Sequence, residues 1–377
     1  MLHRIGDIYA ERSERGAADM ELLSVTMNGG VMQRSEIEGK DNSSEDKSNY
    51  KVVRKGDMVY NSMRMWQGAN GVSPYDGIVS PAYTVLTAKL PICNEYFAAL
   101  FKNYKLINEF KKNSQGMTSD TWNLKYPQIK TIKVYLPRVT EQEKVASLLV
   151  TLDKRIAAQA TLVEQLKKYK RGVMQRIFRN MSVVSPSGFE TVKLSAIFKK
   201  VSRRNNKSEI KNVITNSAEY GLIPQRDFFD KDIAVDGNTS NYYVIEQGDF
   251  VYNPRKSNAA PYGPFNRYER EERGIISPLY TCLVLQADIE PSYLAWYFKS
   301  DAWYRYIYDN GSQGVRHDRV SMTDGLLMGI PVIIPSKEAQ LKIAKLLDCL
   351  ESRFQTELSQ YESLKSIRVA LLQQLFI

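Results

Sequence analysis

The sequence is poor in the residues that metal sites, disulfides and membrane spans require. It has two histidines and three widely spaced cysteines in 377 residues. So few histidines leave little room for histidine-dependent acid–base or metal chemistry, and an odd, scattered set of cysteines is typical of a reducing cytoplasm. No apolar run approaches the roughly 18–20 residues that cross a bilayer, and the first residues lack the apolar segment of a signal peptide. We expect a cytoplasmic protein with no metal and no membrane partner.

Glycine-rich phosphate or cofactor loops are missing too, because Gly29-Gly30 and residues 68–71 fit neither known spacing. Two short segments resemble catalytic motifs. Asn253-Pro254-Arg255-Lys256 lacks the aromatic residue with which amino-methyltransferases stack on a flipped base, and Glu38-Gly39-Lys40 has no suitable upstream aspartate for a nuclease. We expect a chain that is not an enzyme and needs no cofactor.

The formal net charge of +10 favours an acidic partner such as nucleic acid. The charge is uneven, since residues 141–180 carry nine Lys or Arg against four Asp or Glu, and residues 338–377 carry five of each. Many basic proteins bind no nucleic acid, so charge alone does not decide the function.

The most informative feature is an internal repeat. Tyr50–Asn61 returns as Tyr242–Asn253, and Gly77–Leu86 returns as Gly274–Leu283. The triplet Ser-Gln-Gly at 114–116 also returns at 312–314. The offset drifts only from about 192 to 198 residues, far above the roughly 20–50 residues of a solenoid repeat. The pattern indicates a duplicated domain, with residues 1–140 expected to superpose on 190–337.

Each copy contains short β-forming runs between glycine, asparagine and proline residues, without sustained alternation of strands and helices. A helix is predicted around Asn94–Lys112 and another near the N-terminus. We therefore predict an α+β fold of two similar mixed domains. Residues 1–140 would form the first domain and 181–337 the second.

Residues 141–180 and 338–377 have a different pattern. Apolar residues recur at alternating steps of four and three from Val145 to Ile177, which is a coiled-coil seam of about five heptads. A helix of about 38 residues is roughly 55 Å long, too long for one domain to cover. The two helices are therefore predicted to pack on each other as an antiparallel pair that separates the two domains.

Polar residues replace apolar ones at two equivalent positions of the seam in each helix. These residues are Gln159 and Lys170 in the first helix and Glu357 and Arg368 in the second. Antiparallel packing about a pseudo-two-fold axis predicts that paired positions add to 527, so that Lys170 faces Glu357 and Gln159 faces Arg368. Parallel packing would bring Lys170 and Arg368 together. The alternative is that both columns reach water or partner proteins.

Taken in order, these features resemble the specificity (S) subunit of a type I restriction–modification system. The resemblance is carried by Leu22–Val25 followed by Gly30-Val31, by the Gly-Asp turns at 56–59 and 248–251, and by Leu136-Pro137-x-x-x-Glu141-Gln142 at the start of the long helix. It covers essentially the whole chain. The second copy departs from it, because Ala339 stands where the first has Glu141. The chain also begins at the first domain's opening helix, without a leader that many relatives carry, so the resemblance does not extend to the family's N-terminal contacts.

The resemblance implies two target-recognition domains that each read half of a split double-stranded DNA site. It also implies that the helices bind two DNA methyltransferase (M) subunits, which hold S-adenosylmethionine and methylate adenine, and that restriction/translocase (R) subunits join the complex. Two alternatives stay open: the specificity subunit of a related bifunctional type II enzyme, and a self-sufficient DNA methyltransferase with its own cofactor site.

The loops that follow the Gly-Asp turns are the first candidates for DNA contact. Arginine suits guanine O6 and N7, and asparagine or glutamine suits adenine N6 and N7. The residues that flank these loops are similar in the two copies, whereas the loop residues differ. This is expected if one fold reads two DNA sequences. The alternative is a solvated surface loop. The candidates are Asn61, Arg64 and Gln67 in the first copy, and Arg255, Lys256 and Asn258 in the second.

The segments around the Ser-Gln-Gly triplets are the second candidates. The second copy offers cations there, and the first offers hydroxyl and amide groups, so either phosphates or base edges are possible partners. A plain loop before the next strand is the alternative. The candidates are Ser114, Gln115 and Thr121 in the first copy, and Gln313, Arg316, His317 and Arg319 in the second.

Overall fold

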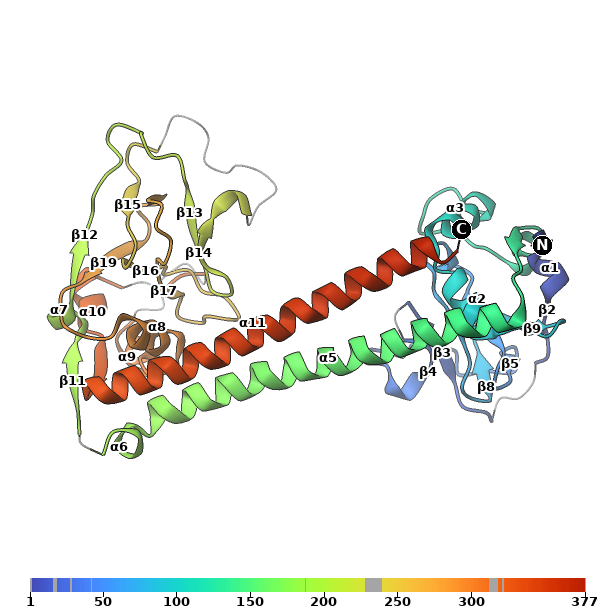
Figure 1. The fold of residues 1–377 in the computed structure, drawn as a ribbon, viewed down its shortest axis with the longest axis horizontal. Helices are drawn as coiled ribbons and strands as arrows, with labels where there is room; N and C mark the ends of the chain where they lie inside the picture. Colours follow the sequence, from blue (N-terminus) through green and yellow to red (C-terminus); the bar gives the residue numbers. More distant parts are fainter. Residues whose placement is uncertain are drawn as a thin grey trace. The chain divides into compact units, whose positions relative to one another are not determined.

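A computed structural model describes residues 2–15, 19–27, 29–41, 43–186, 188–227, 239–311, 318–320 and 322–376. The chain divides into two compact units. Unit 1 contains residues 1–161 and 358–377, and unit 2 contains residues 162–357. The two long helices, α5 (Val139–Arg179) and α11 (Lys337–Gln374), each contribute one part to either unit (Figure 1).

Unit 1 is built on the four-stranded antiparallel sheet β2-β9-β6-β7, with the two-stranded pairs β1-β10, β3-β4 and β5-β8. Its strands are β1 (Leu2–Arg4), β2 (Tyr9–Glu11), β3 (Leu23–Thr26), β4 (Gly30–Gln33), β5 (Lys51–Val53), β6 (Met58–Asn61), β7 (Asn70–Val72), β8 (Gly77–Val79), β9 (Tyr83–Ala88) and β10 (Lys133–Tyr135). Its shorter helices are α1 (Ile5–Ile8), η1 (Arg34–Glu36), η2 (Met65–Gln67), α2 (Asn94–Leu100), α3 (Tyr104–Asn113) and α4 (Tyr126–Ile129).

Unit 2 repeats this topology with the four-stranded sheet β12-β19-β16-β17 and the pairs β11-β20, β13-β14 and β15-β18. Its strands are β11 (Phe189–Lys193), β12 (Phe198–Val201), β13 (Ile214–Ser217), β14 (Gly221–Pro224), β15 (Tyr243–Ile245), β16 (Phe250–Tyr252), β17 (Phe265–Arg267), β18 (Gly274–Ile276), β19 (Thr281–Leu285) and β20 (Pro331–Pro335). Its shorter helices are α6 (Met181–Val184), α7 (Leu194–Ile197), η3 (Gln225–Asp227), α8 (Pro291–Lys299), α9 (Tyr304–Asn310) and α10 (Asp324–Met328).

The Gly-Asp turns of the repeat precede the same strand in both units, β6 and β16. Gly56 and Gly248 both have φ +93°, which favours glycine. The carboxylate of Asp57 accepts hydrogen bonds from the Arg54 N–H at 2.8 Å and from Arg12 Nε at 2.8 Å. Asp249 likewise accepts from the Glu246 N–H and from Arg203. The motif therefore fixes the turn that begins the central strand.

The glutamine of the Leu-Pro motif also has a structural role. Gln142 is 1% exposed, accepts from the Cys93 N–H at 2.9 Å and donates to the Pro137 carbonyl at 2.9 Å. Gln340 makes the same two bonds, from the Glu290 N–H and to the Pro335 carbonyl, both at 2.9 Å. Each long helix is thus tied at its start to the segment before the unit's α2 or α8.

The helix predicted around Asn94–Lys112 is two helices, α2 and α3. Asn103 separates them, because its extended backbone caps α3 and its side chain accepts from the Lys105 N–H at 2.9 Å. The Asn103 side chain also donates to the Leu372 carbonyl of α11 at 2.8 Å. The break therefore lets α2 and α3 pack around the end of α11 within unit 1. The helix predicted near the N-terminus is the short α1.

The long helices pack together in both units, with α5 and α11 residues joining each main core. In unit 1, Arg368 of α11 binds Asp153 of α5. In unit 2, Lys170 of α5 binds Glu351 of α11, with its ammonium 4.6 Å from the Phe354 ring centre.

These partners differ from the predicted pairs of Lys170 with Glu357 and of Gln159 with Arg368. Lys170 and Arg368 have partners other than Glu357 and Gln159, and both observed pairs add to 521 instead of 527. A shift of about one heptad leaves the apolar seam matched, so the apolar pattern does not distinguish the two registers. Lys170 and Arg368 bind the carboxylates of Glu351 and Asp153, which lie beside the apolar seam. The aliphatic parts of the two cationic side chains can then cover apolar neighbours. The predicted α+β class, with two similar sheet units and two long helices packed together, is confirmed.

Candidate nucleic-acid interface

Two loops predicted separately from the sequence lie side by side in unit 1. Loop A follows β6 (residues 61–68), and loop B joins α3 to α4 (residues 114–124). The Leu124 N–H donates to the Ser62 carbonyl at 2.9 Å. The rings of Trp66 and Trp122 meet edge to face, with centroids 5.2 Å apart. The two loops therefore form one continuous surface.

Unit 2 joins the equivalent segments in the same way. Its loop A follows β16 (residues 253–258), and the described part of its loop B is residues 318–320. The Val320 N–H donates to the Pro254 carbonyl at 2.9 Å, as Leu124 does to Ser62. A second bond runs from the Lys256 N–H to the Asp318 carbonyl at 2.8 Å. Because main-chain groups make these bonds, the pairing persists although the loop side chains differ.

Several of the predicted side chains point into solvent on this surface. Arg64 and Gln115 are exposed in unit 1, and Arg255 and Asn258 are exposed in unit 2. Arg64 Nη1 lies 3.4 Å from Gln67 Oε1, a weak bond that leaves the planar guanidinium at the surface. These residues have the accessibility and the hydrogen-bonding groups that base or phosphate contact requires.

Other predicted residues are engaged in local structure. Asn61 Oδ1 accepts from the Met63 N–H at 3.0 Å and fixes the turn at the start of loop A. Ser114 Oγ donates to the Phe110 carbonyl at 2.7 Å, at the end of α3. Thr121 Oγ1 donates to the Thr118 carbonyl at 2.9 Å and closes the tip of loop B. For these three side chains the geometry favours a role in shaping the loops.

The charge of the unit 2 surface is moderated by one carboxylate. Arg255 Nε and Arg319 Nε each lie 3.8 Å from Asp318 Oδ2. Exposed ion pairs of this length are weak, so both guanidinium groups can exchange the carboxylate for a phosphate at little cost. Beneath loop A, burial raises the pKa of Tyr252, whose neutral phenol donates to the Tyr262 carbonyl at 2.9 Å.

Three predicted residues, Gln313, Arg316 and His317, lie outside the described residues. The sequence did not predict the contact between Trp66 and Trp122, although each of these tryptophans lies in one of the two candidate loops. Asp318, which pairs with both arginines, was also missed. A carboxylate between two candidate DNA-contacting cations gives no signal until the backbone brings Arg255 and Arg319 together.

Among the described residues, no group of three or more His, Cys, Asp or Glu side chains could hold a metal ion. Within the same part of the chain, no helix is both long and apolar enough to cross a membrane.

Residues 17–168 match the family model of the type I restriction modification DNA specificity domain. In Methanocaldococcus jannaschii, the type I restriction enzyme MjaVIII specificity subunit is 29% identical over 130 residues, 34% of this chain and 29% of that protein. The MjaX specificity subunit is 25% identical over 147 residues, 37% of this chain and 34% of that protein. The chain thus matches about a third of the length of these curated relatives.

Solved structures match over the entire chain. The HsdS subunit from Thermoanaerobacter tengcongensis has a TM-score of 0.54 at 16% identity and is covered over 96% of its length. The type I S subunit from M. genitalium gives 0.57 at 14% identity, also covered over 96%. A chain from a structure of complex assembly in the type I system gives 0.60 at 15% identity, covered over 97%. At these identities the likeness shows a shared fold.

Proposed function

We infer that this chain reads DNA for a type I restriction–modification system, because residues 17–168 match the family model of the DNA specificity domain of such systems. Units 1 and 2 each read one half of a split double-stranded site. The long helices hold two methyltransferase subunits that methylate adenine, and restriction/translocase subunits join this assembly for cleavage. The chain itself carries no catalytic step and works in the cytoplasm.

The observation that carries this proposal is the repeated loop pair. Both units join loop A to loop B by an N–H to carbonyl bond of 2.9 Å at equivalent positions, Leu124 to Ser62 and Val320 to Pro254. The exposed side chains on the two pairs differ. Base contacts carry the sequence information. Two units that read different half-sites therefore need the same loop backbone with different exposed hydrogen-bonding side chains.

The chemistry of the exposed residues agrees with double-stranded DNA. Arg64 in unit 1 and Arg255 in unit 2 offer planar guanidinium groups for guanine edges, and Gln115 and Asn258 offer amides for adenine edges. The net charge of +10 supplies a general attraction to phosphates.

The proposal is tested by sequencing methylated adenines in cells that produce the full complex. We expect a split target, and we expect Arg64→Ala and Arg255→Ala to relax one base pair each, in different halves. A bidentate guanine contact is worth about 1–3 kcal/mol, or roughly 5- to 150-fold in discrimination. An unchanged methylation pattern in both variants would show that loop A does not read bases.

Two exposed arginines provide matched controls. Arg54 and Arg273 lie near the start of β6 and of β16, whereas loop A follows the end of each strand. Arg54 binds Glu14 at 3.0 Å, and Arg273 binds Glu246 at 3.0 Å. Arg54→Ala and Arg273→Ala remove the same charge without touching either loop pair. They are expected to leave the methylated sequence unchanged.

A further inference from the structure

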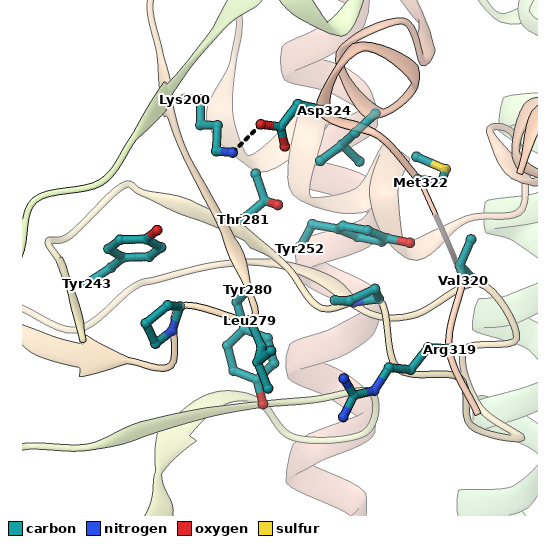
Figure 2. Close-up of a pocket in the computed structure, with 13 residues that line it drawn as sticks. Lys200, Tyr243, Tyr252, Leu279, Tyr280, Thr281, Arg319, Val320, Met322 and Asp324 are labelled. Carbon is teal, nitrogen blue, oxygen red and sulfur yellow. Dashed lines mark hydrogen bonds and ion pairs between the residues drawn. The ribbon is translucent and has the colours of Figure 1, made fainter. Parts of the chain in front are cut away.

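Unit 2 contains a cleft of about 480 Å³ beside its loop pair (Figure 2). Figure 2 shows the Lys200–Asp324 ion pair at one end and Arg319, Tyr280 and Leu279 at the other. The volume lies within the range of about 300–1,000 Å³ that is typical of sites for small organic groups. The other lining residues with polar groups that a ligand could contact are Tyr243, Tyr252 and Thr281.

The cleft is continuous with the surface proposed to meet DNA. Pro254 of loop A and Arg319 and Val320 of loop B are part of its wall. Pro254 and Val320 are also the two residues whose backbone groups join the loops. A DNA strand that lies on the loop pair therefore passes the mouth of the cleft.

Unit 1 fills the equivalent place with its own side chains. Glu11 pairs with Leu86 as Lys200 pairs with Leu283, so Glu11 is the counterpart of Lys200. Lys51 begins β5 as Tyr243 begins β15. Lys51 is 8% exposed, and its ammonium lies 3.2 Å from Glu11 Oε1 and donates to the Tyr83 carbonyl at 2.8 Å.

A third side chain adds to the filling in unit 1. Tyr126 begins α4 as Asp324 begins α10, and its hydroxyl donates to the Tyr9 carbonyl at 2.8 Å. In unit 2 the shorter Asp324 instead turns to Lys200 at 2.5 Å. Unit 2 has Tyr243, Lys200 and Asp324 where unit 1 has Lys51, Glu11 and Tyr126, and these three unit 2 residues line the cleft.

One residue makes the mouth of the cleft apolar. Leu279 is 62% exposed, and the repeat has Ala82 at this position. An exposed leucine beside a partly buried tyrosine is a surface that a planar or sugar group can cover. Arg319, whose side chain is 34% exposed, stands at the same end.

We propose that this cleft binds one unstacked nucleotide of the DNA held by unit 2, with its phosphate at Arg319 and its base and sugar on Tyr280 and Leu279. The inference rests on the proposed function. Phosphate binding alone requires only the cation, whereas the aromatic and apolar wall adds a contact for a ring. A base stacked within the duplex cannot enter a concave site, so the nucleotide must leave the stack at an unstacking cost of a few kcal/mol.

The first experiment measures binding of the full chain to duplexes that carry the methylated target, at low salt. Leu279→Ala installs the residue of unit 1 and is expected to weaken binding about 3- to 10-fold, the loss for one leucine surface that no longer covers a ligand. Leu341→Ala is the matched control, because Leu341 is 50% exposed on α11 of the same unit and does not line the cleft. Equal affinities of the two variants would overturn the proposal.

The second experiment detects the unstacked nucleotide directly. Duplexes with 2-aminopurine at successive positions should brighten at one position in the half-site read by unit 2 when the full chain binds. The double variant Lys200→Glu/Tyr243→Lys rebuilds the filling ion pair of unit 1 and should abolish that signal while circular dichroism stays unchanged. Binding without brightening at any position would overturn the cleft proposal and leave the proposed function intact.

A failure of the proposed function would give a different experimental result from a failure of the cleft proposal. In that case the unaltered chain would bind no duplex more tightly than a random one of the same length. If the signal persists in the filled variant, the nucleotide unstacks elsewhere and the cleft proposal is wrong. If the filled variant instead loses binding to a protein subunit while DNA binding is unchanged, the cleft belongs to a protein contact.

Discussion

The Gly-Asp turn permits a quantitative test of how each unit holds its central strand. Asp57 has a side chain 7% exposed, and Arg12 has one 24% exposed. Asp57 accepts from Arg12 Nε at 2.8 Å, from Arg12 Nη2 at 3.2 Å and from the Arg54 N–H at 2.8 Å. Asp57→Asn keeps the shape and one acceptor, but it removes the charge that Arg12 faces.

The expected loss follows from this geometry. Breaking a buried pair strands its partner at a cost of about 3–5 kcal/mol, and the partial exposure of Arg12 with the retained amide oxygen lowers this to about 2–3 kcal/mol. For a unit of about 180 residues, each kcal/mol shifts the unfolding midpoint by about 2–4 °C. We therefore expect Asp57→Asn to lower the midpoint of unit 1 by about 4–12 °C.

The assay is thermal and urea unfolding of the full chain, with Arg12→Met and the double variant completing a mutant cycle. The coupling between Arg12 and Asp57 should be about 1–3 kcal/mol. Arg54→Ala is the control, since Arg54 pairs with Glu14 at the surface and should cost less than 1 kcal/mol. A loss below 1 kcal/mol for Asp57→Asn, or additive effects in the cycle, would refute the role given to the motif.

Further predictions concern the helix pair and loop B. Burial alone would raise the pKa of Glu351, but hydrogen bonds from Gln355 and Lys170 and the charge of Lys170 lower it below its ordinary 4.5. This stabilisation is therefore complete above about pH 4.5 and is lost as pH falls through the lower folded pKa, and acid unfolding of Glu351→Gln should lack that component. Gly116 has φ +141°, and a Cβ there would lie 2.5 Å from the Thr121 carbonyl oxygen; Gly116→Ala should lower the unfolding midpoint and weaken DNA binding, and a neutral result would contradict the described loop. Gly172→Ala in α5 meets nothing within 4 Å and should raise stability by about 0.5–1 kcal/mol in denaturant unfolding.

The sequence predicted the repeat and the long helices because both leave periodic signals. The Gly-Asp turns, spaced about 192 residues apart, precede equivalent central strands, β6 and β16, as expected from a duplicated domain. The seam from Val145 to Ile177 predicted a helix that the structure has as α5. These features depend on local sequence, so one chain is enough to find them.

The helix register was not predictable from the same pattern. A heptad repeat is unchanged by a shift of seven, and only side-chain reach decides between the alternatives. Lys170 extends past the seam to Glu351, a residue that the apolar pattern treats as outside the interface. A register derived from seam positions alone cannot include such a flanking partner.

The candidate interface was predictable as two sets of loops, but not as one surface. Nothing in the sequence places residue 62 against residue 124, because the contact joins distant segments through backbone groups. The cleft of unit 2 was equally hidden. Its lining residues Lys200, Tyr243 and Asp324 come from distant parts of the sequence. The volume between packed side chains cannot be read from a sequence pattern.

The backbone bonds that join the loops bear on how such a protein can evolve. The Ser62 and Pro254 carbonyls are present whatever side chains those positions carry, and the Leu124 and Val320 N–H groups are present with any residue except proline. Exposed residues on the loops, such as Arg64 and Arg255, contribute little to folding, where surface substitutions usually change stability by less than about 0.5 kcal/mol. If the loops read DNA as proposed, a lineage can exchange these residues one at a time and acquire a new target without passing through an unstable intermediate. Selection on recognition and selection on folding act on different atoms of the same loops.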